Sequence, residues 1–201
     1  MTTMQQPAQA AAPDATQSEA VAAPKFAGWK RILIGVLLLL LLIVGTYALA
    51  WYNANRLSQR FMAHADAAYA EGNYTLALTG REAYDADAQQ YVRTGGYIDV
   101  ERIWSHPYSW PIPDITAEAR ERAQEIIFGE LSIEEAEQYV QANIGRPAPY
   151  FGEIYLHLGD LYLQEGDERS AREVFESVAQ LFPRRADLIE GAQEGLAQLD
   201  E

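Results

Sequence analysis

The sequence contains no cysteine among its 201 residues, which excludes disulfide frameworks, thiolate metal sites and cysteine nucleophiles. Its only histidines, His64, His106 and His157, are far apart in the chain, so a zinc site built from imidazoles is not expected. Basic residues are scarce, 15 against 29 acidic ones, and the formal net charge is −14. This deficit argues against binding to nucleic acid, whose phosphate backbone requires clustered Lys and Arg.

Sequence patterns of known catalysts are also missing. The chain has no glycine-rich phosphate loop and no G-x-S-x-G nucleophile elbow. Asp85-Ala86-Asp87 resembles the start of a calcium loop, but the glycine and the distal glutamate that such a loop needs are not there. We therefore expect no enzyme, no metal site and no cofactor.

Large apolar side chains are rare at the start of the chain and then suddenly continuous. Residues 1–28 are mainly Ala, Gln, Thr and Pro, and such a segment buries too little surface to offset its ordering entropy, so we expect a disordered tail. Residues 32–52 form an uncharged run of 21 residues, and roughly 20 helical residues cross a bilayer. Trp29 and Trp51 mark the two ends, as in an aromatic belt. We predict a transmembrane helix over residues 29–52 that contacts lipid through residues 32–52.

Two other interpretations of this run are weaker. A signal peptide could be cleaved after Ala48-Leu49-Ala50, but the apolar run exceeds the roughly 7–15 residues of a signal core. A buried helix of a soluble domain is disfavoured because six leucines, 37–42, leave no polar face. Three basic residues precede the run and two, Arg56 and Arg60, follow it, which favours a carboxyl-terminal domain outside the cytoplasm.

Residues 53–201 carry 12 arginines, no lysine and 27 acidic residues, and their apolar positions recur at helical spacing. The clearest unit is residues 152–185, in which two amphipathic segments flank a Gly166-Asp167 turn and Pro183 ends the second. Eight positions there resemble the signature of the tetratricopeptide repeat family, which is about 34 residues long. These positions are Tyr155, Leu158, Gly159, Tyr162, Gly166, Ala171, Phe175 and Pro183. The resemblance implies an all-α stack of antiparallel helical hairpins.

Weaker units extend this stack. Residues 58–91 are a degenerate copy in which Ala65, Gly72 and Ala77 keep the repeat spacing, although Arg81 replaces a large apolar residue. Residues 116–147 form a second degenerate hairpin, with a capping box at Ser132 to Glu135. Residues 186–200 are expected to form a capping helix at the end of the stack.

An aromatic and proline-rich insertion, residues 94–115, separates the first two units. Its large residues Tyr97, Trp104, Tyr108 and Trp110 are of the types enriched at protein interfaces. A second interpretation, which we favour, is an ordered loop that packs on the helical stack or lies against the bilayer.

The resemblance also implies a concave binding face on the first helix of each hairpin. In the clear repeat this face consists of Glu153, Leu156, His157, Asp160, Leu163 and Gln164, and in the degenerate one it includes Met62, Asp66 and Tyr69. The mixture is acidic and apolar, so a basic or apolar protein segment is the expected ligand, and solvated helix faces are an equally good interpretation.

The expected function is a membrane-tethered scaffold, adaptor or assembly factor that binds one or more membrane-associated proteins. The layout is similar to single-pass periplasmic tetratricopeptide proteins, which implies a bacterial inner membrane. The alternative is a permanent accessory subunit of a large membrane complex, packed through its anchor helix and the aromatic insertion.

Overall fold

The computed structural model of the chain describes residues 26–86 and 89–200. Residues 1–25 of the predicted disordered tail lie outside this range, whereas residues 26–28 belong to the first helix. The chain divides into two compact units, residues 1–46 and 47–201.

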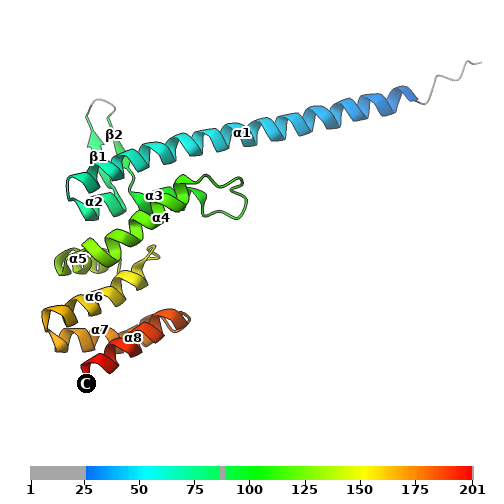
Figure 1. The fold of residues 1–201 in the computed structure, drawn as a ribbon. Coiled ribbons are helices and arrows are strands. Elements are labelled where there is room, and N and C mark those ends of the chain that lie inside the picture. The colour runs from blue at the N-terminus through cyan, green and yellow to red at the C-terminus, as the bar shows by residue number, and fades with distance from the viewer. Residues whose placement is uncertain (1–25, 87–88, 201) are drawn as a thin grey trace, which may run out of the picture. The chain divides into compact units, whose positions relative to one another are not determined.

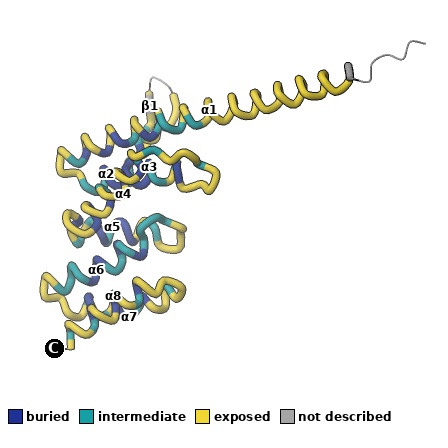
Figure 2. The backbone as a smooth tube through the Cα atoms, turned by 45° about the vertical axis from the view of Figure 1, so that its right-hand side comes forward, coloured by how far each residue is buried: buried dark blue, intermediate teal, exposed yellow. Residues whose placement is uncertain are grey.

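Helix α1 (Phe26–Ala70) contains both the apolar run and the segment predicted to open the first repeat. No helix boundary separates these two segments, contrary to the division predicted at residue 52. The helix continues because the sequence offers no proline after the run, and it ends just before Gly72, whose φ is +73°. Residues 28–70 are long and apolar enough to cross a membrane, and the most apolar stretch is fully exposed (Figure 2). A signal sequence shares this pattern.

The prediction of a helix in the second half of the repeat over residues 58–91 is wrong. Helix α2 (Tyr74–Thr79) is only six residues long, and strands β1 (Arg81–Asp85) and β2 (Gln90–Thr94) follow it as an antiparallel hairpin in which Arg81 faces Thr94. Gly80 ends the helix at a φ of +64°, and a Cβ there would lie 2.0 Å from the carbonyl oxygen of Thr94. Only glycine therefore permits this turn from helix into strand.

The insertion contains helix α3 (Tyr97–Trp104), which contacts the following helix α4 (Ile115–Glu125). A π-helical turn, η1 (Ile126–Glu130), extends α4 and buries two isoleucines. Helix α5 (Ile133–Asn143) begins at the predicted capping box, in which the Ser132 hydroxyl accepts a hydrogen bond from the Glu135 N–H at 3.2 Å. The helices predicted within residues 116–147 are therefore present, but α4 packs mainly against α3, and α5 packs mainly against α6.

Helices α6 (Phe151–Glu165), α7 (Glu168–Leu181) and α8 (Ala186–Leu199) form the carboxyl-terminal layers of the second unit (Figure 1). The turn at Gly166 and the predicted capping helix are both present. Gly159 allows close approach because a Cβ there would lie 2.5 Å from the Phe175 ring. Ala171 is fully buried, and α7 ends before Pro183. The other signature residues, Tyr155, Leu158 and Tyr162, pack within the apolar clusters.

Two apolar clusters fill the second unit, and dark blue in Figure 2 marks the residues that are buried. The first joins residues of α1 through α6, and the second joins α7 and α8 to one side of α6. Within the described part of residues 47–200 the architecture is all-α apart from the β1–β2 hairpin, as the sequence predicted in outline.

Candidate functional site

Two adjoining hollows lie where α2, α3, α4 and α5 meet the loop before α6. The first has a volume of about 300 Å³, and the second of about 510 Å³. They share Ile98, Arg102 and Pro149. We refer to them as the first and the second hollow.

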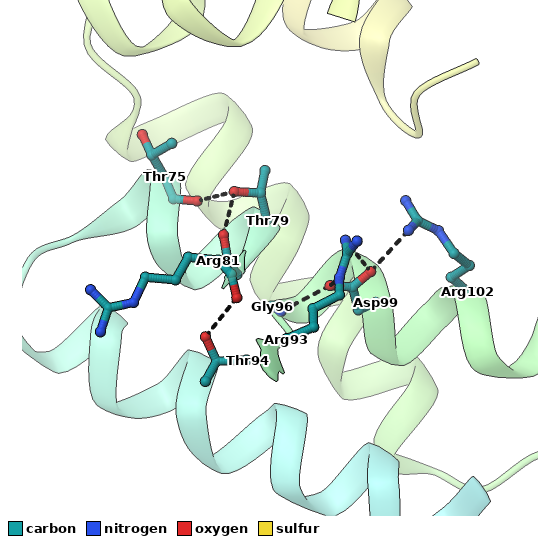
Figure 3. Close-up of polar contacts among 9 residues, drawn as sticks. Thr75, Thr79, Arg81, Arg93, Thr94, Gly96, Asp99 and Arg102 are labelled. Carbon is teal, nitrogen blue, oxygen red and sulfur yellow. Dashed lines mark hydrogen bonds and ion pairs between the residues drawn. The ribbon is translucent and has the colours of Figure 1, made fainter. Parts of the chain in front are cut away.

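A buried carboxylate holds two arginines at the edge of the first hollow. Asp99 accepts hydrogen bonds from Arg93 at 2.9 and 3.1 Å and from Arg102 at 3.0 Å, as Figure 3 shows. The Gly96 N–H also donates to this carboxylate at 3.4 Å, because Asp99 is the third residue of α3 and its side chain reaches back to the residue before the helix. Both guanidinium groups are half exposed, so one buried negative charge fixes two cations beside the hollow.

The β1–β2 hairpin delivers Arg93 to this cluster. The Thr94 hydroxyl donates a hydrogen bond to the Arg81 carbonyl at 3.0 Å across the hairpin, and the Thr79 hydroxyl donates to the Thr75 carbonyl at 2.8 Å within α2 (Figure 3). The first bond fastens the open end of the hairpin, and the second stabilises the last turn of the short helix. This cluster was not predicted, because residues 81–91 of the hairpin that supplies Arg93 were expected to belong to a helical repeat.

The second hollow combines an apolar floor with a buried polar group that lacks a partner. Ile98, Trp104 and Ile112 contribute the apolar surface. Thr116, only 7% exposed, lines the same hollow, and its Oγ1 is buried without a hydrogen-bond partner among the described residues. A buried hydroxyl without a partner is unfavourable, so this group is a local cost to the stability of the fold.

Tyr150 forms one wall of the second hollow in a strained conformation. Its φ is +59°, which few residues with a side chain adopt, and it immediately precedes α6. The Tyr150 hydroxyl donates to Glu101 at 2.6 Å, and Arg120 binds the other oxygen of Glu101 at 3.0 Å. Burial and this hydrogen bond raise the pKa of Tyr150 well above its ordinary value. Nothing in the sequence pattern indicates this backbone conformation.

Tyr139 lines the first hollow and makes stability sensitive to alkaline pH. Burial raises the pKa of Tyr139 to about 12, whereas an unfolded tyrosine titrates near 10. The neutral phenol is therefore favoured in the folded state, and its contribution, complete below about pH 10, is lost as the pH rises toward 12. We expect Tyr139→Phe to flatten the fall in urea-unfolding stability between these pH values. Loss of the hydrogen bond from Tyr139 to Pro149 alone would lower the stability without changing how steeply it falls with pH. An unchanged slope of stability against pH would therefore contradict this expectation.

The predicted concave face of α6 is largely occupied by intramolecular contacts. Leu156 lies under α8, where a Cβ on Gly191 would be 2.8 Å from it, and Leu163 packs in the second cluster. His157 is buried, with its ring 5.6 Å from that of Phe128 and its Nδ1 3.7 Å from Asp160. Glu153 pairs with Arg185 at 2.8 Å and borders the second hollow. Of the six predicted residues, only Gln164 is freely exposed.

The other predicted binding residues divide into core and surface. Met62 is buried, Asp66 accepts a hydrogen bond from the Tyr97 hydroxyl at 2.7 Å, and the Tyr69 hydroxyl donates to Glu125 at 3.1 Å. Tyr97 and Trp104 belong to the buried interior. Tyr108 and Trp110 are 79% and 75% exposed. The structure therefore leaves only these last two aromatic residues of the insertion available to a partner.

Among residues 26–86 and 89–200, no three histidine or acidic side chains gather in a way that could hold a metal ion. Comparisons with protein-family models, with curated proteins and with solved structures each found no match.

Proposed function

We propose that the protein is a membrane-anchored helical interaction module that acts as a scaffold, adaptor or assembly factor for a membrane complex. Its repeats are proposed to be of the tetratricopeptide type. The α6–α7 hairpin supports this assignment, because Gly159, Ala171 and Phe175 make the close helix contact that the repeat signature implies.

The apolar part of α1 is proposed to remain as an uncleaved anchor. The helix runs without interruption through Ala48-Leu49-Ala50, the sequence that resembles a cleavage site, and on into the first apolar cluster. Lys30 and Arg31 precede the apolar run and favour a cytoplasmic amino end. The carboxyl-terminal domain would then lie outside the cytoplasm, on the periplasmic or outer face of a bacterial inner membrane.

The second hollow is the proposed site of protein binding. Its volume of about 510 Å³ suits one or two large side chains, and its apolar floor favours an apolar segment of a polypeptide. Arg102 and Arg120 are already engaged by carboxylates, so charge contributes little to the choice of partner.

Ala117→Arg tests this proposal, because Ala117 is an exposed residue that lines the second hollow. A long charged side chain there should fill the entrance and weaken partner binding about tenfold or more, which corresponds to about 1.4 kcal/mol. The measurement is the amount of partner that co-purifies with the tagged full-length chain from its native membranes in mild detergent. Ala197→Arg, the same substitution at an exposed position of α8, is the matched control and should retain the partner. Equal recovery with both variants would reject the second hollow as the binding site.

A permanent subunit of a membrane complex is the second candidate, and the exposure of Tyr108 and Trp110 favours it. Size-exclusion chromatography after detergent extraction separates the two candidates. A stable assembly of high mass supports the subunit, and a free chain supports the adaptor.

A further inference from the structure

The loop between α3 and α4 exposes apolar and aromatic side chains without any charged residue among them. Between Arg102 and Asp114 the sequence has no Asp, Glu, Lys or Arg. Tyr108, Trp110 and Ile112 are 79%, 75% and 56% exposed, although each is large and apolar. An exposed group of this kind in a chain with a net charge of −14 calls for a partner that is itself apolar.

Two side chains of α1 bind the backbone of this loop. The Tyr47 hydroxyl donates to the carbonyl oxygen of Tyr108 or Trp110 and accepts a hydrogen bond from the Trp110 N–H at 3.1 Å. The Trp51 indole N–H donates to the Pro111 carbonyl at 2.8 Å. The Trp110 N–H, the Pro111 carbonyl and one further carbonyl of the loop are thus satisfied within the protein, which lowers the cost of placing this segment against lipid.

These contacts also set the position of the loop along the apolar run. Tyr47 and Trp51 lie in the last turns of the run that ends at Tyr52, and five helical residues span only about 7.5 Å along the axis. Arg56 follows one turn later, with its guanidinium 5.9 Å from the centre of the Tyr52 ring. Aromatic residues followed by a cation are typical of the boundary between hydrocarbon and headgroups.

We infer that this loop rests in the interfacial layer of the bilayer, where Tyr108, Trp110 and Ile112 contact lipid beside the end of the anchor helix. The inference depends on the proposed membrane anchor but not on the protein-binding hollow. Lipid fits this surface because the loop lies against the apolar end of the anchor helix and contains no Asp, Glu, Lys or Arg. Tyr and Trp are the residues most enriched at this depth of a membrane.

The absence of cysteine allows a direct test with single nitroxide labels on the full-length chain. Tyr108→Cys places a label on the loop and leaves Trp110 intact, and the Tyr108 side chain is 79% exposed, with its ring centre 5.3 Å from that of His106. The reference positions are Leu39→Cys in the apolar run and Gln198→Cys on the exposed face of α8. After reconstitution into phospholipid vesicles, the ratio of collisions with oxygen to collisions with a water-soluble nickel chelate reports the depth of each label.

We expect the ratio for the Tyr108→Cys label to be severalfold above that for Gln198→Cys and below that for Leu39→Cys. A ratio equal to that of Gln198→Cys overturns the inference, and so does spectral broadening that reveals a second copy of the chain against the loop. If the Leu39→Cys label is also aqueous, the anchor itself fails, which separates the two proposals. A label at Trp110→Cys repeats the measurement if the first variant does not reconstitute.

Discussion

Replacing Phe175 with alanine is expected to lower the free energy of unfolding of the helical domain by about 3–5 kcal/mol. The ring is 1% exposed and lies between α6 and α8, at positions where neither helix has a side chain. A Cβ on Gly159 or on Gly195 would come within 2.5 Å of it, so no neighbouring side chain can move in to fill the cavity. Urea unfolding of the full-length chain in mild detergent, followed by circular dichroism, measures the loss.

Phe128→Ala is the matched control for this substitution. Phe128 is 55% exposed, and its truncation removes an edge contact with His157 but opens no enclosed cavity. We expect a loss below about 1 kcal/mol. Similar losses for both variants would show that Phe175 does not join the three helices as described.

Trp104→Ala is expected to be equally severe, at about 3–5 kcal/mol. Trp104 is 4% exposed, its indole N–H donates to the buried Ser58 hydroxyl at 2.7 Å, and its ring lies 5.7 Å from that of Trp51. The substitution removes this apolar contact and also the hydrogen bond that links α3 to α1. The same urea titration measures the effect.

Trp110→Ala distinguishes the exposed position of Trp110 from the packing role of Trp104 within the insertion. Because Trp110 is 75% exposed, its truncation should change the stability in detergent by about 0.5 kcal/mol or less. If Trp110→Ala proves as destabilising as Trp104→Ala, the exposed position of the loop tip is incorrect.

The two tryptophans illustrate what the composition of a segment can and cannot predict. Both occur in a stretch rich in aromatic residues and proline, and the sequence analysis assigned them the same candidate role. Burial depends on contacts with α1, about fifty residues earlier in the chain, and no local pattern encodes them. Trp104 therefore packs on the helical stack, whereas Trp110 is left exposed.

The α6–α7 hairpin was predictable because its determinants are local. Small residues at Gly159 and Ala171, the turn at Gly166 and the stop at Pro183 all act within one repeat. The β1–β2 hairpin was not predicted, although Arg81 already departed from the repeat pattern at its first residue. Repeat spacing favoured a helix through residues 80–91, and neither strand shows the apolar–polar alternation that would have indicated β structure.

The site residues were the least predictable part of the chain. Asp99 meets Arg93, six residues earlier, across the Gly95-Gly96 connection from β2 to α3, and the unpartnered hydroxyl of Thr116 is a property of three-dimensional packing. The family resemblance placed binding on one face of α6, which α8 and η1 cover instead.

Helix α6 separates the two apolar clusters, with Ile154 and Leu158 in the first and Leu156 and Leu163 packed against the second. In a layered array each element depends on its immediate neighbours. Detachment of α8 would bring Leu156 and the Phe175 ring into water while Ile154 stayed enclosed. A local opening at α8 would therefore remove protection from one side of α6 and leave the other side packed.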